Sequence, residues 1–156
     1  MTAAVHRYHA RCRWEGSTAG GYEGYDRAHD AVAEPAGGHL GLSADPAFRG
    51  DPARLNPEQL VVMAAASCQL LSFLASAALS GVDVRAYVDD AEGEMPEDDH
   101  PVRITRIVLR PRIEVAEGAS EAIVRRLVAK AHDNCYVANT LRCDLEVQPT
   151  IVFVPA

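Results

Sequence analysis

The uncharged segment at residues 60–79 constrains the fold more than any other part of this sequence. It follows a run in which Asn56 suits an N-cap, Pro57 suits the first helical position, and Gln59 stands three residues after the cap. Gly81 supplies a stop. The pattern predicts a helix from residue 57 to about residue 80, apolar on almost every face. We expect it to be buried on most faces, with help from a second subunit in a chain of 156 residues.

A membrane-spanning helix is the alternative interpretation, because 20 uncharged residues are long enough to cross a bilayer. Four polar side chains dilute the segment, however, and no cluster of lysine or arginine flanks it. We therefore expect a central helix and no membrane association. The first 16 residues lack the apolar stretch of a secretory signal, so a cytoplasmic location is expected.

Composition narrows the classes of function. The chain has 15 lysine and arginine residues against 22 aspartate and glutamate residues, which gives a formal net charge of −7. Without a basic run, such a chain is poorly suited to binding phosphate backbones or anionic lipid surfaces. We therefore expect no nucleic-acid partner. Hydrophobic residues make up 48% of the chain and charged residues 24%, which is typical of a globular protein, and the length predicts a single domain over residues 1–156.

The N-terminal part predicts short strands. Residues 8–14 alternate between apolar and charged side chains, which indicates a half-buried strand. The glycine-rich run after it predicts a turn, with a hairpin partner that begins near Tyr22 and contains Arg27. A third strand is expected at residues 39–43, and the Pro-, Gly- and Asp-rich residues 44–60 predict a surface loop leading into the helix.

The C-terminal part predicts further strands and a second helix. Residues 82–88 and 105–115 alternate as strands, and residues 142–154 predict a closing strand broken near Pro149. Between them, Ser120 is placed to cap a helix. We expect inward-facing side chains at Val82, Val84, Ala86, Val88, Ile107, Leu109, Ile113, Val115, Val124, Leu127, Val128 and Ala131. The order of elements predicts an α+β fold on a mostly antiparallel sheet.

Cys68 places a thiol in the middle of the uncharged segment. A buried cysteine is either inert packing or a nucleophile kept away from water. Cys68 lies far from the helix N-terminus and burial alone raises the pKa of a thiol, so a nucleophilic Cys68 needs a cation from elsewhere. Arg27, Arg49 and Arg54 are the candidates. Glu58, in the first turn of the helix, can hold an arginine in a bidentate pair.

The other three cysteines have different settings. Cys135 continues the apolar stripe of the second helix and can face Cys68, whereas Cys12 and Cys143 belong to strands and are interpreted as structural. His132 and Cys135 form half of a zinc site, but the sequence has no second close pair, so no metal is expected. A cysteine hydrolase with His29 as its base is a further alternative, although no oxyanion-hole loop is recognisable.

Four segments resemble the OsmC/Ohr family of thiol-dependent peroxidases in order and spacing. They are GYDRAHD at residues 24–30, SADPAFRGDPARLNPEQLVVMAAASCQLLSFLA at 43–75, GVDVRAYVDDAEGEM at 81–95 and AHDNCYVANTL at 131–141. The resemblance covers residues 14–154 and is nearer to the OsmC-like branch than to the organic hydroperoxide resistance branch. It implies an OsmC-like α+β fold with a long buried central helix, in an intertwined homodimer with active sites at the subunit interface.

The resemblance also implies a chemistry, since family members are antioxidant enzymes that reduce hydroperoxides, often organic ones. Cys68 matches the peroxidatic cysteine and Cys135 the resolving cysteine, which together form a redox-active disulfide. Arg27 matches the arginine that holds the thiolate, with Arg49 as its substitute, and Glu58 matches the carboxylate that orients this arginine. The resemblance implies no bound cofactor, only an external dithiol reductant, which carries a lipoyl group for some members.

Two further interpretations stay open beside the peroxidase. The first is a non-catalytic protein that binds a small hydrophobic ligand in an interface pocket, and the second is a redox sensor that is oxidised once without turnover. The sequence also departs from many relatives in one place, because they carry a histidine directly after the reactive cysteine where this chain has Gln69.

Overall fold

The computed structural model describes residues 4–155, so the first three residues and the last residue of the predicted 1–156 domain lie outside the described part. The chain forms two compact units, residues 1–60 and residues 61–156. Both helices and sheets are present, and of the six strand pairings between described residues four are antiparallel. The predicted α+β class is confirmed.

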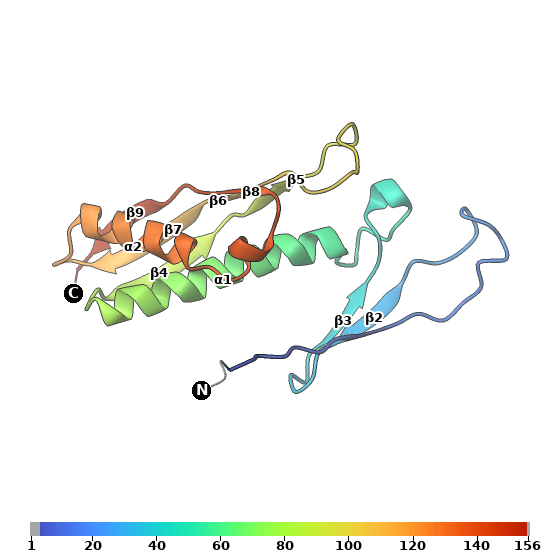
Figure 1. Ribbon diagram of the computed structural model, residues 1–156, viewed down its shortest axis with the longest axis horizontal. Coiled ribbons are helices and arrows are strands. Elements are labelled where there is room, and N and C mark those ends of the chain that lie inside the picture. The colour runs from blue at the N-terminus through green and yellow to red at the C-terminus, as the bar shows by residue number, and fades with distance from the viewer. Residues whose placement is uncertain (1–3, 156) are drawn as a thin grey trace. The chain divides into compact units, whose positions relative to one another are not determined.

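The first unit contains an antiparallel sheet in the order β1-β2-β3 (Figure 1). Its strands are β1 (Arg11–Arg13), β2 (His29–Val32) and β3 (His39–Leu42), followed by the 3-10 helix η1 (Pro46–Phe48). The third strand was predicted at residues 39–43 and is confirmed. The loop predicted after it is present as well, with η1 inside it.

Two predictions about the first hairpin are wrong. The first strand spans Arg11–Arg13 and is exposed on both faces, rather than half-buried over residues 8–14. Its partner begins at His29 rather than near Tyr22, because two successive turns close at Gly21 and Gly24 and extend the loop. Arg27 consequently lies in this loop and not in a strand.

Helix α1 (Pro57–Leu79) begins in the first unit and continues in the second. Its start is a capping box, in which the Asn56 side chain accepts from the N–H of Gln59 at 2.8 Å and the Gln59 side chain accepts from the N–H of Asn56 at 3.0 Å. Its end is followed by Gly81 with a φ of 68°. The predicted boundaries of this helix are therefore confirmed.

Burial of α1 within one chain is confined to a single stripe. The buried residues are Ala65, Gln69, Phe73 and Ala77, whereas other apolar side chains are exposed, with Leu71 at 63%. The predicted burial on most faces of the helix is therefore not found within one chain. By length and composition α1 is also apolar enough to cross a membrane, a test that core helices pass as well.

The second unit contains two three-stranded sheets, in the orders β4-β7-β9 and β5-β6-β8. Their strands are β4 (Val84–Asp89), β5 (Glu92–Glu94), β6 (Arg106–Leu109), β7 (Pro111–Ala116), β8 (Asp144–Val147) and β9 (Thr150–Val154). The strand predicted at residues 105–115 is divided at Arg110 between the two sheets, and the closing strand is broken beside Pro149 as predicted.

Helix α2 (Glu121–Asp133) begins where it was predicted, since the Ser120 hydroxyl accepts from the N–H of Ile123 at 3.3 Å. Its stripe packs with Phe73 and Ala77 of α1 on the β4-β7-β9 sheet, beside which α1 runs in Figure 1. Nearer the start of α1, Ala65 packs on Ile107 and Leu109 of β6. The predicted inward residues of β6, β7 and α2 are all buried.

The predicted alternation in β4 is wrong in its second half. A β-bulge between Val84 and Ala86 shifts the register of pairing with β7. Beyond the bulge, Tyr87 turns inward and Val88 becomes 61% exposed. One extra residue moves every later side chain of a strand to the opposite face, which the period of the sequence cannot reveal.

Candidate functional site

The thiols of Cys68 and Cys135 lie together in the second unit. Cys68 is partly buried on α1, and Cys135 is 1% exposed just after the end of α2. The N–H of Cys135 donates to the carbonyl of His132 at 3.1 Å, which ties the residue to the last turn of α2. The structure thus brings together two of the four predicted site residues that are far apart in the sequence.

The turn after α2 brings backbone N–H groups near both thiols. The N–H groups of Tyr136 and Val137 contribute to lowering the pKa of Cys68, and those of Val137 and Ala138 oppose the rise in the pKa of Cys135. The turn leads into the 3-10 helix η2 (Ala138–Thr140). It is held by the N–H of Asn139, which donates to the Cys135 carbonyl at 3.0 Å.

These surroundings move the pKa values of the two thiols in opposite directions. Burial raises the pKa of Cys68, but hydrogen bonds from the N–H of Val137, the thiol of Cys135, the N–H of Tyr136 and the hydroxyl of Ser72 outweigh it, so the pKa is lowered. The pKa of Cys135 is raised, first by burial, and also by its hydrogen bond to Cys68 and by the negative charge on Cys68. The pair therefore favours a thiolate at Cys68 and a thiol at Cys135.

The sequence pattern did not identify the groups that lower the pKa of Cys68. It indicated the need for a cation, whereas the structure supplies backbone N–H groups at residues 136 and 137 and a hydroxyl at Ser72. Ser72 follows Cys68 by one helical turn, so the spacing of four residues could have indicated it. The N–H groups carry no side-chain signal and become visible only when the turn is seen against α1.

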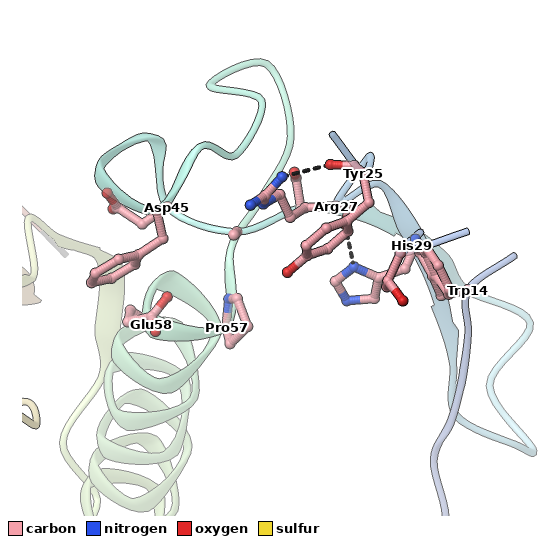
Figure 2. A pocket seen from close by; sticks show the side chains of 11 residues that line it. Trp14, Tyr25, Arg27, His29, Asp45, Pro57 and Glu58 are labelled. Carbon is pink, nitrogen blue, oxygen red and sulfur yellow. Dashed lines mark hydrogen bonds between the residues drawn. The ribbon is translucent and has the colours of Figure 1, made fainter. Parts of the chain in front are cut away.

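Arg27 and Glu58 line one cavity of about 380 Å³ in the first unit (Figure 2). Trp14, Tyr25 and Phe48 supply aromatic walls. The Arg27 guanidinium donates to the Tyr22 carbonyl at 2.6 Å and to the Tyr25 carbonyl at 2.5 Å. It also lies over both tyrosine rings, 4.7 Å and 4.0 Å from their centroids. Its position is therefore set by its own loop.

Glu58 lies on the first turn of α1 and is not paired with Arg27. Figure 2 shows the Arg27 guanidinium turned toward the Tyr25 backbone. Within residues 4–155, the Glu58 Oε2 atom is buried without a hydrogen-bond partner. A buried acceptor without a donor costs about 1–3 kcal/mol, so this carboxylate can bind an additional donor.

The alternative cations are already paired. Arg49 forms an ion pair with Glu23, and Arg54 lies 3.8 Å from Asp51. Of the three arginines considered for the thiolate, Arg27 is the one without a carboxylate partner in the described part of the chain. Its charge thus remains available for an anion. Cys68 and Cys135 belong to the second unit of the chain, whereas the Arg27–Glu58 cavity belongs to the first.

The remaining predicted residues have other surroundings. His29 lines the cavity with Arg27, whose carbonyl lies 2.9 Å from its Nδ1 atom. Among the described residues, no group of three or more His, Cys, Asp and Glu side chains is placed to hold a metal ion. Cys143 packs against the core around Ile107, whereas Cys12 is exposed, so the structural interpretation of Cys12 has no support.

Comparison with known proteins agrees with this fold over almost the whole chain. The model of the family described as OsmC-like protein matches residues 50–150. The uncharacterized protein YmaD of Bacillus subtilis is 21% identical over 150 residues, which cover 93% of each chain. A solved OsmC-like protein of unknown function from Vibrio cholerae has a TM-score of 0.83 at 26% identity and covers 94% of this chain and 100% of that one.

Two organic hydroperoxide resistance proteins have the same fold. The structure from Elizabethkingia anophelis has a TM-score of 0.72 at 15% identity, with 98% of this chain and 100% of that chain covered. OhrB of Bacillus subtilis has a TM-score of 0.61 at 16% identity, with 96% and 100% covered. The family model spans well over half of the residues, and the chain therefore belongs to the OsmC/Ohr family.

Proposed function

We propose that this protein is a thiol-dependent peroxidase that reduces organic hydroperoxides, with hydrogen peroxide as a second substrate. The observation that carries the proposal is the pair of adjacent thiols whose pKa values are moved apart, down at Cys68 and up at Cys135. Membership of a family that includes organic hydroperoxide resistance proteins supports it.

In the first step, the Cys68 thiolate attacks the terminal oxygen of the hydroperoxide. The S–O bond forms as the O–O bond breaks, which leaves a sulfenic acid on Cys68 and an alkoxide that takes up a proton to become an alcohol. An unperturbed thiol with a pKa near 8.5 is only about 3% thiolate at pH 7, so the lowered pKa of Cys68 increases the reactive fraction.

In the second step, Cys135 attacks the sulfur of the Cys68 sulfenic acid. The disulfide forms, the S–O bond breaks, and the hydroxide leaves as water with the proton that Cys135 releases. An external dithiol, for which a lipoyl group is the proposed example, then reduces the disulfide by two successive exchanges. No bound cofactor is part of this cycle.

Arg27 is proposed to place the peroxide and to stabilise the Cys68 thiolate, and Glu58 is proposed to orient Arg27. Two observations support these roles. Arg27 has no carboxylate partner in the described part of the chain, and the Glu58 Oε2 atom is buried there without a donor. A bidentate pair between the two side chains would satisfy that oxygen and fix the guanidinium.

Replacement of the two cysteines tests the proposed cycle. With cumene hydroperoxide and lipoamide as the dithiol, Cys68→Ser should abolish turnover, because no thiol remains to attack the peroxide. Cys135→Ser should permit one oxidation and then stall or overoxidise, since the sulfenic acid has no resolving thiol. Cys143→Ser is the control and should turn over normally. Retained turnover in the Cys68→Ser variant would exclude the proposal.

We also propose that the protein works as a homodimer in the cytoplasm. The exposed face of α1 carries Met63, Leu71 and Leu74, an apolar surface that a second copy would cover. Sedimentation of the wild type should give a dimer, and Leu71→Glu should shift it toward a monomer because a charge would be buried at the contact. A monomeric wild type would contradict this part of the proposal.

Binding of a small hydrophobic ligand is the second candidate function. It is favoured by the volume of the cavity in the first unit, about 380 Å³, and by its aromatic walls. This alternative predicts that an apolar fluorescent probe binds equally well to the wild type and to Cys68→Ser, and that peroxide leaves both cysteines unchanged. Oxidation of the cysteine pair on addition of peroxide would contradict it.

A further inference from the structure

Gln69 is next to Cys68 in the sequence and links α1, which carries Cys68, to α2, which precedes Cys135. Its side-chain Nε2 atom donates to the main-chain carbonyl of Val128 on α2 at 3.2 Å. The residue is 1% exposed and belongs to the buried stripe of α1. We infer that Gln69 is a positioning residue that sets Cys135 against Cys68 for disulfide formation, an inference that rests on the two-cysteine function proposed above.

The hydrogen bond reaches the part of α2 that holds Cys135. The Val128 carbonyl lies in the turn of α2 that precedes its last one, where the regular helix pattern also gives it the N–H of His132 as a donor. The carbonyl of His132 in turn accepts the N–H of Cys135 at 3.1 Å. A short series of hydrogen bonds therefore runs from the residue beside Cys68 to the backbone of Cys135.

Packing alone does not account for an amide at this place. Only the nitrogen of the Gln69 amide is satisfied, because its Oε1 atom is buried without a hydrogen-bond partner among residues 4–155. A leucine would fill a similar volume without burying an unpaired acceptor. A leucine could not, however, donate a hydrogen bond to the second lone pair of the Val128 carbonyl. This hydrogen bond is the one directional contact that Gln69 makes with α2.

The step that depends on this alignment is the closure of the disulfide. The Cys135 sulfur attacks the Cys68 sulfur of the sulfenic acid, the S–S bond forms, and the S–O bond breaks with release of water. Attack of Cys68 on the peroxide oxygen requires only Cys68, whereas closure requires the Cys135 sulfur in line with the S–O bond of the Cys68 sulfenic acid. Loss of the Gln69 contact should therefore slow the second step and leave the first nearly unchanged.

Three variants separate positioning from general loosening of the core. Gln69→Leu removes the donor and keeps the volume, whereas Gln69→His keeps an N–H that can reach the Val128 carbonyl. Phe73→Leu is the matched control, because Phe73 is also fully buried on the same stripe of α1 but makes no hydrogen bond to α2. Each variant is reacted with cumene hydroperoxide, and sulfenic acid and disulfide are followed separately by mass spectrometry.

The same variants are equilibrated in a glutathione redox buffer, which forms the Cys68–Cys135 disulfide without any peroxide. Misplacement by about 1 Å can cost about 100-fold in rate, so Gln69→Leu should slow closure and weaken the disulfide equilibrium by at least about tenfold. Gln69→His should restore both to within about threefold of the wild type, since a single hydrogen bond is at stake. Phe73→Leu should leave both nearly unchanged.

The inference is overturned if Gln69→Leu closes the disulfide as readily as the wild type, if Phe73→Leu impairs closure equally, or if Gln69→His gives no rescue. It is also overturned if the wild type forms no Cys68–Cys135 disulfide in glutathione. A wild type that forms the disulfide in glutathione but not with peroxide would instead contradict the proposed peroxidase, and the equilibrium measurements would still decide the role of Gln69.

Discussion

The surroundings of Cys68 and the cavity that holds Arg27 are built in different ways. Around Cys68, hydrogen-bond donors come from the backbone after α2 and from the next turn of α1, so they are fixed by the packing of two helices on a sheet. Around Arg27, the guanidinium is held by two carbonyls and two aromatic rings of a loop, while a buried oxygen of Glu58 has no partner in the described part of the chain.

The difference separates two tasks of the proposed peroxidase. The second unit supplies a thiol with a lowered pKa and a neighbouring thiol, and no arginine, lysine or carboxylate is among the causes of the two pKa shifts. The first unit supplies a charged group and an apolar cavity, which under the proposed function would recognise the hydroperoxide. We therefore expect substitutions in the second unit to change the reactivity of the thiols and the stability, and substitutions in the first unit to change the reaction with peroxide.

The largest expected effect is on stability and comes from the core of the second unit. Phe73 is fully buried and its ring lies 5.9 Å from that of Tyr87. Phe73→Ala should lower the free energy of unfolding by about 3–5 kcal/mol, because it leaves a cavity. In β3 of the first unit, Leu40 is 42% exposed, and Leu40→Ala should change the value by less than about 0.5 kcal/mol. Urea denaturation measures the free energy of unfolding of both variants. Equal losses in the two would contradict the expected difference in stability between the two units.

The next effect tests the role of the first unit. Arg27→Ala should slow oxidation of Cys68 by cumene hydroperoxide on the order of 100-fold, as does loss of a single donor to a developing anion. Arg49→Ala is the control, because Arg49 is already paired with Glu23, and its rate should match the wild type. Rapid-mixing measurement of a single oxidation gives these rates. A slow Arg49→Ala and a normal Arg27→Ala would reverse the assignment.

The pH dependence tests the role of the second unit. The thiolate is the reactive form and the pKa of Cys68 is lowered, so the rate should rise with pH and reach half its maximum below about 8.5, the value for free cysteine. Since the lowered pKa favours the ionised form in the folded state, Cys68 stabilises the fold above the pKa of the unfolded chain, and this contribution is lost as pH falls through the lowered pKa. A midpoint at or above that of free cysteine would contradict the lowering.

The smallest effect concerns Ser72. Its hydroxyl is the last and weakest of the groups that lower the pKa of Cys68, so Ser72→Ala should raise this pKa slightly. Loss of a single neutral hydrogen bond should reduce the rate of oxidation at pH 7 by about two- to tenfold. Ser76→Ala, one turn further along α1, is the matched control. A larger loss for Ser72→Ala than for Arg27→Ala would contradict the division of tasks between the two units.

Local signals in the sequence were sufficient for both helices. Asn56, Gln59 and Gly81 predicted the ends of α1, and Ser120 predicted the start of α2, because caps and left-handed stops depend on neighbouring residues only. The inward positions of β6 and β7 followed from their alternation. The same local reasoning predicted that Cys135 is buried, which is confirmed, but it also placed the residue on the second helix, whereas α2 ends at Asp133 and Cys135 lies in the turn that follows.

Features that depend on distant residues could not be predicted. The bulge near Ala86 depends on how β4 pairs with β7, and it turned Val88 outward. The loop before β2 is longer than expected because two successive turns close at Gly21 and Gly24, and its tyrosine rings contact Arg27. Two of the groups that lower the pKa of Cys68 are the backbone N–H groups of Tyr136 and Val137, which every residue but proline possesses, so no residue type could indicate them.

The most direct test of the proposed function is peptide mapping of the cysteines. The reduced protein receives one equivalent of cumene hydroperoxide, is quenched after seconds, and is digested for mass spectrometry. The proposed cycle predicts a Cys68–Cys135 disulfide, with Cys12 and Cys143 still free. If Cys68 and Cys135 both remained free thiols after many minutes, Cys68 would be a packing residue and the peroxidase proposal would be wrong.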